Sequence, residues 1–206
     1  MLKEQERGQV RRARILDAAV QVFTRKGYRD SGMEDIAAEA ETSKGGLYFH
    51  FPSKQALFLN LLDRMTGLLI ERTETVISVE ADPLARADAA LRVVLGTFAA
   101  HRGLTRLFLC EAMGAGPEFN VKMASIHRQF AALISRHLDD AVADGAILPL
   151  DTDLAALVWF GALNQVVTRW ALTEPPGDLE ATYPALRTLL LRSIGAPIEA
   201  GEEAHA

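Results

Sequence analysis

The sequence is poor in the features that mark secreted and membrane-embedded proteins. A single cysteine, Cys110, excludes an intramolecular disulfide and is typical of a protein kept in a reducing cytoplasm. Long hydrophobic runs are missing, because the most apolar stretch, from Gln55 to Ile70, is interrupted by Asp63 and Arg64. The N-terminal stretch MLKEQERGQVRRAR also lacks the apolar core of a signal peptide. We therefore predict a cytoplasmic protein with no membrane association.

Catalytic and metal-binding patterns are equally scarce. The five histidines are scattered, and His50 has no neighbour at the spacing of a second metal ligand. We find no Ser-His-Asp arrangement and no glycine-rich loop that would hold phosphate groups. The sequence thus predicts no catalytic residues, no metal site and no cofactor. An enzyme or a small-molecule carrier with an incidental helical head is kept as an alternative function.

Strand-like alternation of polar and apolar residues is absent, whereas apolar residues recur at helical spacing throughout. In the first segment, Ile15, Ala19 and Val22 fall on one face, and the segment ends at Gly27. The pattern predicts an all-α protein of about nine helices. The further helices are expected over residues 33–40, 44–51, 104–113, 118–144, 153–173 and 179–195, with two more that begin at residues 53 and 83.

The net charge of −5 is unevenly distributed along the chain. Residues 1–54 contain ten Lys and Arg against eight Asp and Glu, whereas the rest contains twelve against nineteen. A slightly basic head on an acidic body is what a phosphate-facing module would show. Arg11, Arg12 and Arg14 are candidates for phosphate contact, and a solvated charged face is the equal alternative.

Three short helices followed by a long one, with a four-residue connection between the second and the third, predict a helix-turn-helix. The third helix, KGGLYFHF, is the expected recognition helix, with Leu47 and Phe51 facing inward. It begins with Lys44, Gly45 and Gly46, and these small or basic residues would let the backbone approach the floor of a DNA groove. The tyrosine and histidine behind them suit phosphate oxygens.

The run RRARILDAAVQVFTRKGYRDSGMEDIAAEAETSKGGLYFHFPSKQALF resembles the DNA-binding domain of the tetracycline-repressor (TetR) family of bacterial transcriptional regulators. Its most specific portion, SKGGLYFHFPSKQAL, matches the family pattern S-x-G-x-L-Y-x-H-F-x-x-K-x-x-L. The resemblance implies a DNA-binding domain over 1–54, a ligand-binding and dimerisation domain over 55–197 and a polar tail over 198–206. The implied function is a ligand-responsive repressor that binds a palindromic operator as a homodimer. An activator without an effector is the alternative.

The resemblance also implies contact roles for the matching positions of the head. Gly32 lacks the hydroxyl that the family's Thr or Ser supplies, so this phosphate contact is expected to pass to Ser31. Glu41 stands where the family has a turn glycine, which costs about 1 kcal/mol if its φ is positive. The implied base contacts are Lys44, Gly45, Gly46 and Phe49, the last with a thymine methyl group. The implied phosphate contacts are Ser31, Ser43, Tyr48, His50 and Lys54.

Family members dimerise through their last two long helices, which implies residues 154–171 and 179–194 in this chain. Both segments are apolar around most of the helix, which independently favours an interface. The expected interface residues are Leu157, Gly161, Val167, Trp170, Tyr183, Leu186 and Leu190.

The helices between residues 83 and 173 are expected to enclose a small-molecule effector. Methionines and aromatics at helical spacing are candidate wall residues, and polar groups among them could orient the ligand; a plain core residue is the alternative for each. The segment GLTRLFLCEAMGAGPEF is similar to family members that sense fatty acyl chains or acyl-CoA, and a flat aromatic effector is the alternative. The candidates are Phe98, His101, Leu104, Phe108, Met113, Phe119, Met123, His127, Phe130, Trp159 and Asn164.

Overall fold

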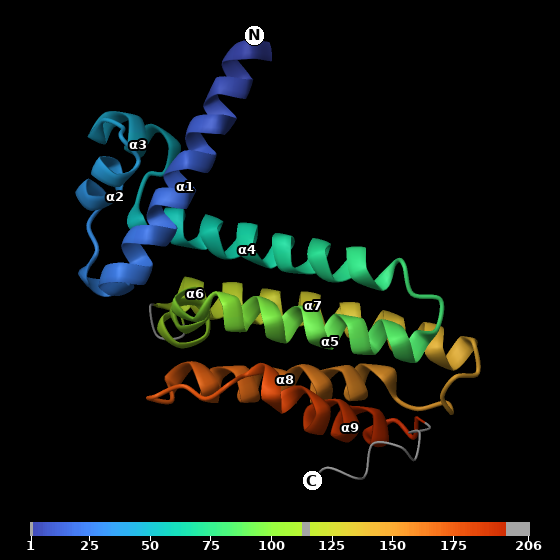
Figure 1. Cartoon of the computed structure of the whole chain (residues 1–206). Coiled ribbons are helices and arrows are strands. Elements are labelled where there is room, and N and C mark those ends of the chain that lie inside the picture. Colours follow the sequence, from blue (N-terminus) through green and yellow to red (C-terminus); the bar gives the residue numbers. More distant parts are fainter. Residues whose placement is uncertain (1, 113–115, 197–206) are drawn as a thin grey trace. The chain divides into compact units, whose positions relative to one another are not determined.

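The computed structural model describes residues 2–112 and 116–196, and the regular structure in these two ranges is entirely helical (Figure 1). This confirms the predicted all-α class. None of the described helices is both long and apolar enough to span a membrane. The α-helices are α1 (Leu2–Asp30), α2 (Met33–Glu39), α3 (Lys44–His50), α4 (Lys54–Ile77), α5 (Pro83–Ala100), α6 (Arg102–Arg106), α7 (Pro117–Ala143), α8 (Thr152–Leu172) and α9 (Tyr183–Ser193), with a π-helical segment η1 (Leu107–Glu111) after α6 and a 3₁₀ turn η2 (Glu180–Thr182) before α9.

Short polar side chains fix the starts of three helices. Ser43, Asp82 and Asp151 are the N-cap residues of α3, α5 and α8, and each side-chain oxygen accepts a hydrogen bond from the backbone N–H three residues later, at 2.7–3.1 Å. Caps of this kind stabilise a helix by about 1 kcal/mol each. They place the helix starts where the sequence predicts them.

The helix expected over 104–113 begins at Arg102 and is π-helical from Leu107, and the largest departures from the expected boundaries are in α1 and α9. Gly27 breaks α1 as expected, with φ 79° and ψ 164°, but a further helical turn follows and extends to Asp30. The last helix begins at Tyr183 instead of residue 179, because Pro184 occupies its first turn and the preceding residues form the 3₁₀ turn η2.

The described chain divides into two compact units. Unit 1 contains residues 2–67, 103–112 and 116–122, so the head expected over 1–54 lies within it together with the first half of α4 and the segment around α6 and η1. An aromatic cluster forms its core around Phe58. The Phe58 ring centroid lies 4.7 Å from that of Tyr28, 5.3 Å from that of Phe23 and 5.4 Å from that of Phe119. Helices α1, α4 and α7 therefore meet in one core.

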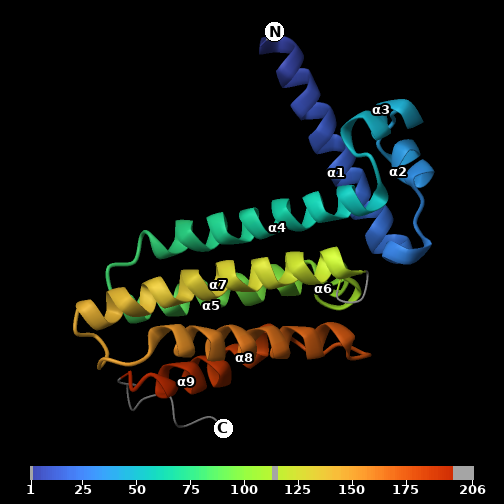
Figure 2. The same ribbon diagram turned by 180° about the vertical axis from the view of Figure 1, so that it is seen from behind.

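Unit 2 contains residues 68–102 and 123–196 of the described chain. In both views the end of α4, then α5 with α7, and then α8 with α9 lie in successive layers (Figures 1 and 2). Hydrogen bonds join α7 to α8, across two layers, and α8 to α9, within the last layer. The Ser135 hydroxyl donates to Asp153 at 2.7 Å, and the Trp159 indole N–H donates to the Ser193 hydroxyl at 3.0 Å.

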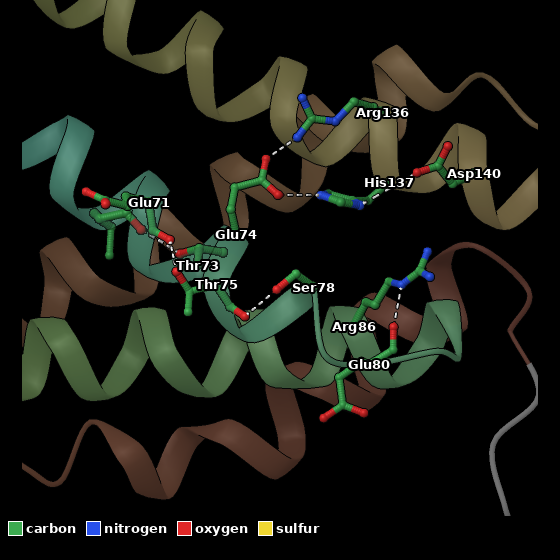
Figure 3. Close-up of polar contacts among 11 residues, drawn as sticks. Glu71, Thr73, Glu74, Thr75, Ser78, Glu80, Arg86, Arg136, His137 and Asp140 are labelled. Atoms are coloured by element: carbon green, nitrogen blue, oxygen red, sulfur yellow. Dashed lines mark hydrogen bonds and ion pairs between the residues drawn. The ribbon is translucent and has the colours of Figure 1, made fainter.

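A polar cluster holds the end of α4 against α7 within unit 2 (Figure 3). The Glu74 carboxylate accepts a hydrogen bond from Arg136, and its other oxygen lies 3.5 Å from Nε2 of His137. In the loop that follows α4, the carbonyl of Glu80 accepts a hydrogen bond from Nε of Arg86 at 2.8 Å, and this bond ties the loop to the start of α5. Single exposed pairs of this type contribute little, but several together fix the helix register.

Candidate nucleic-acid interface

The turn between α2 and α3 holds a non-glycine residue, Glu41, at a positive φ. Glu41 has φ 47°, in the left-handed region that a glycine would adopt without strain. The amide of Ala40 donates to Ile36 at 2.9 Å and that of Thr42 to Ala37 at 3.0 Å, so α2 ends within one turn. The chain then reverses, and α3 packs against α2. The arrangement is that of a helix-turn-helix.

Helix α3 has one buried side and one exposed side. Leu47 is fully buried and Phe51 is 1% exposed, which confirms the inward pair that the sequence predicts. On the other side, the Phe49 side chain is 85% exposed and Tyr48 is 40% exposed, while Lys44 and Gly45 are exposed as well. A fully exposed phenylalanine beside a lysine suits contact with base edges and thymine methyl groups.

The two glycines at the start of α3 serve different purposes. A Cβ on Gly46 would lie 2.9 Å from the Thr42 hydroxyl and 3.2 Å from the Ser43 hydroxyl that caps the helix. Gly46 is therefore required by the cap itself. A Cβ on Gly45 would meet nothing within 4 Å, so at Gly45 no side chain covers the exposed backbone of α3. Of the two, Gly45 is the one whose missing side chain would admit a groove floor.

The exposed acids of α2 pair with cations of the head. Lys44 Nζ lies 2.6 Å from Glu34, and this ion pair lowers the pKa of Glu34 and raises that of Lys44. Lys26 pairs with Asp35 at 2.8 Å. Glu34 and Asp35 both lie in the first turn of α2, a position where acidic residues also complement the helix dipole. The sequence alone does not reveal the cations that pair with these acids, because two residues about ten positions apart on different helices leave no periodic pattern.

His50 lies half-buried at the end of α3. Burial lowers its pKa, and the nearby charges of Arg11 and Arg12 lower it further. The imidazole is therefore neutral near pH 7 and offers an N–H donor to a phosphate oxygen. Arg12 is exposed, donates to Asn60 and lies 5.2 Å from the centre of the Phe51 ring.

Ser31 does not present its hydroxyl to solvent. The side chain is 4% exposed and donates to the carbonyl of Tyr28 at 2.9 Å, while the amide of Gly32, the N-cap residue of α2, donates to the Asp35 carboxylate at 3.0 Å. The expectation that Ser31 replaces the missing hydroxyl of Gly32 at a phosphate is not supported by this arrangement. A contact there would use the backbone.

Lys54 has a structural role that the sequence does not reveal. Its ammonium donates to the carbonyls of Tyr28, Arg29 and Ser31 at 2.7, 3.1 and 2.8 Å, and it lies 4.7 Å from the centre of the Tyr28 ring. These bonds use all three N–H donors of the side chain and neutralise the carbonyl end of α1. The predicted phosphate contact of Lys54 would require it to release one of these carbonyls.

The expected effector residues are distributed over both units. Phe119 is 1% exposed and belongs to the core of unit 1. The half-buried Phe108 stacks on Phe58 with 6.1 Å between ring centroids, and the half-buried Leu104 lies in the same unit. In unit 2, His127 and Phe130 lie against Phe160, with 4.9 and 6.1 Å between ring centroids. Met113 lies outside the described residues. The remaining candidates, Phe98, His101, Met123, Trp159 and Asn164, belong to unit 2.

Four of the expected interface residues are buried inside the protomer, contrary to the expectation from sequence. Val167, Tyr183, Leu186 and Leu190 are at most 9% exposed. Tyr183 also donates its hydroxyl to Asp88 of α5, and burial together with this bond raises its pKa to about 12. Helices that are apolar all round do not reveal which side faces their own core. The half-buried Trp170 donates to the carbonyl of Gly177 at 2.7 Å.

The apolar residues on the surface of α8 and α9 include only some of the predicted interface residues. Leu157 and Gly161, which the sequence predicts, are exposed, and Leu154 and Val158 lie beside them on the same face of α8 at 58% and 53% exposure. On α9, Leu189 is 67% exposed. The spacing of 154, 157, 158 and 161 is that of one helical stripe, a signal that was present in the sequence.

Comparison with known proteins agrees with this geometry. Residues 15–61 match the model of the bacterial regulatory proteins of the tetR family, and residues 80–181 match that of the tetracyclin repressor-like C-terminal domain. The HTH-type transcriptional regulator TtgR of Pseudomonas putida is 30% identical over 189 residues, which cover 86% of this chain and 88% of the relative. The fatty acid metabolism regulator protein of Bacillus subtilis (strain 168) is 26% identical over 181 residues, 87% of this chain and 93% of the relative.

Among solved structures, the transcriptional regulator FadR from Bacillus subtilis in complex with stearoyl-CoA superposes with a TM-score of 0.81 at 26% identity, covering 88% of this chain and 98% of that one. The matches span the helix-turn-helix head and the helical body alike. The chain therefore belongs to the TetR family of DNA-binding bacterial transcriptional regulators.

Proposed function

We propose that the protein is a one-component repressor that binds a palindromic operator as a homodimer and releases it when a small apolar effector binds the body. The observation that carries the proposal is the exposed end of α3. There the open backbone at Gly45 and the 85% exposed Phe49 ring lie beside Lys44, on a base formed by the buried Leu47 and Phe51. An exposed aromatic ring and an open backbone beside a cation suit a major groove.

The proposed contacts fall into two classes. Lys44, Gly45 and Phe49 contact base edges, whereas Ser43, Tyr48 and the neutral His50 contact phosphates. Base contacts carry sequence preference and phosphate contacts carry affinity. A recognition helix as short as α3 covers few base pairs, so tight binding needs two heads on a two-fold symmetric site.

The proposed homodimer uses the exposed stripe of α8 together with Leu189 of α9. Leucines that are 58% and 67% exposed in the protomer are apolar surface that association would remove from water. A Cβ on Gly161 would meet nothing within 4 Å, so this position leaves room for the backbone of a partner helix.

The proposed effector is a long-chain fatty acyl-CoA. The similarity to a fatty acid metabolism regulator and to FadR with stearoyl-CoA runs through the whole body and is not confined to the head. The half-buried His127, Phe130 and Phe160 of unit 2 form a mainly apolar cluster, and apolar surroundings are what an acyl chain prefers. Burial lowers the pKa of His127, so its ring adds no charge near pH 7.

Chain connectivity supports a route from effector to head. Helices α4 and α7 each begin in unit 1 and end in unit 2, and the segment 103–122 of unit 1 follows α5 of unit 2 directly. A ligand that displaces α5 or α7 therefore acts on the unit that contains α3. A coupling free energy of about 1–3 kcal/mol changes operator affinity some 5- to 150-fold.

The test uses an operator selected by the wild-type protein from a randomised pool, with binding followed by fluorescence anisotropy at several salt concentrations. We expect a steep salt dependence, and release on addition of stearoyl-CoA but not of free CoA. Lys44→Ala and Phe49→Ala should weaken binding and relax base preference without loss of folding. An affinity that stays constant with salt, or that is equal for these variants, would refute DNA binding through α3.

The same titration separates the alternatives. Operator binding that no acyl-CoA or flat aromatic compound alters, together with unchanged thermal stability in their presence, would favour a DNA binder without an effector.

A further inference from the structure

The N-terminal turns of α1 lie outside the core of unit 1. Among the side chains described, which begin at residue 6, the first buried one is Ile15, and residues 6–14 are exposed apart from the half-buried Gly8. In both views these turns extend past α2 and α3 (Figures 1 and 2). Most helices in proteins gain their stability from packing of an apolar face, and this stretch has none. Packing within unit 1 therefore does not account for its composition.

Arginines form a stripe along this stretch. Arg7, Arg11 and Arg14 are spaced i, i+4 and i+7, which places them on one side of the helix. Arg14 donates to the carbonyl of Glu41, in the turn between α2 and α3, at 3.4 Å. Arg11 lies near enough to His50, at the end of α3, for its charge to lower the pKa of that group after the larger effect of burial. The stripe therefore faces the same side as the helix-turn-helix.

The charge on this stripe is available to a partner. Arg25, Lys26 and Lys44 of the head are each paired with an acid of α2, whereas Arg7 and Arg11 take part in no salt bridge within the described part of the chain. The nearby exposed Glu6 offsets one positive charge and leaves the stretch basic. Exposed, unpaired guanidinium groups next to a DNA-reading helix are complementary to phosphate.

We propose that Arg7 and Arg11 bind the sugar-phosphate backbone of DNA that flanks the operator half-site read by α3. The proposal rests on the proposed function and extends it from the recognition helix to a second element. From Arg7 to Arg14 the helix spans about 10 Å at 1.5 Å per residue, a length that faces several phosphates of a duplex. The flanking DNA is recognised through the charge and shape of its backbone, and its base sequence plays no part in this contact.

The test compares two duplexes and three variants of the full-length protein. One duplex extends beyond the selected operator by about one helical turn on each side, and the other ends at its edges. Arg7→Ala/Arg11→Ala removes the two charges, and Arg7→Lys/Arg11→Lys retains them. Arg72→Ala/Arg128→Ala is the matched control, because it removes two exposed arginines from unit 2.

We expect the wild type to bind the long duplex several-fold more tightly than the short one. The alanine variant should bind both equally, and its slope of log affinity against log salt should fall by about 1 per arginine in each protomer. The lysine variant should retain most of the slope. Base preference should stay that of the wild type in all three variants.

Three results would overturn the inference. If the alanine variant matches the wild type on both duplexes while Lys44→Ala still weakens binding, the flanking contact is absent and the proposed function stands. If the control variant lowers the slope of log affinity against log salt as much as the alanine variant does, the effect comes from the net charge of the protein and not from a contact with flanking DNA. If the wild type binds neither duplex in a salt-dependent way, the proposed function fails and this inference with it.

Discussion

The carboxylate of Glu111 accepts a hydrogen bond from the backbone N–H of Tyr28, with 2.8 Å between Oε2 and N. The bond forms where Gly27 interrupts α1, and a Cβ on Gly27 would lie 3.4 Å from the same carboxylate oxygen. Glu111 is the last residue of the π-helical segment η1, so this bond attaches η1 to the end of α1 within unit 1. A similar close approach exists at Gly103, where a Cβ would lie 2.5 Å from Thr24.

Glu111→Ala should lower the free energy of unfolding by about 1–2 kcal/mol, because it leaves the half-buried amide of Tyr28 without its charged acceptor. Glu111→Gln keeps a carbonyl oxygen at the same place and should recover part of the loss. Urea denaturation followed by circular dichroism measures both. Glu71→Ala, at an exposed acid of α4, should change the midpoint little, and an equal loss in all three variants would contradict the role given to Glu111.

Features set by neighbouring residues could be predicted from the sequence. The inward positions of Leu47 and Phe51 follow from helical spacing, and the caps Ser43 and Asp151 follow from residue type. For Glu41 the family resemblance marked only the position where a positive φ would be strained, and the structure gives this residue φ 47°. Each of these needs information only from within one or two helical turns.

Features set by distant residues could not be predicted. Lys54 is held by the carbonyl end of α1, and nothing in its local sequence distinguishes it from a phosphate-binding lysine. Val167 and Leu157 are both aliphatic residues of α8, and only the packing of the surrounding helices makes the first 0% and the second 58% exposed. The physical reason is the same in both cases. The burial of a side chain and its hydrogen-bond partners depend on which helices pack together, and the spacing of residues within one helix carries no information about that packing.

Gly161→Leu should separate dimerisation from folding. A side chain at this position meets open space in the protomer, and leucine is a better helix former than glycine by up to about 1 kcal/mol, so the protomer should be at least as stable. In a dimer that packs α8 closely, the added side chain should raise the dissociation constant at least about tenfold, or 1.4 kcal/mol. Analytical ultracentrifugation measures this. Gly67→Leu, at another open helical glycine, should leave the dimer unchanged; if both variants dimerise like the wild type, α8 is not the interface.

Glu34→Gln should tighten operator binding about two- to fivefold, because it frees Lys44 from its ion pair and removes a negative charge near the phosphates. A double-mutant cycle isolates the effect. In a Lys44→Ala background the same change should have a clearly smaller effect, since no lysine is left to release. Equal gains in the two backgrounds would mean that Glu34 acts only as a general repulsive charge and that the ion pair does not restrain Lys44.

His127 should make unit 2 less stable in mildly acidic solution. Burial lowers its pKa in the folded protein, so below about pH 6.5 the unfolded chain binds a proton that the folded chain does not. The free energy of unfolding therefore falls as the pH drops from the unfolded toward the folded pKa. His127→Gln has no such proton to bind and should show a shallower dependence of Tm on pH between 7 and 5. Because burial lowers the pKa of His50 as well, His50→Gln serves as the comparison. A His127→Gln variant with the full wild-type dependence would mean that this ring is as solvated in the folded state as in the unfolded one.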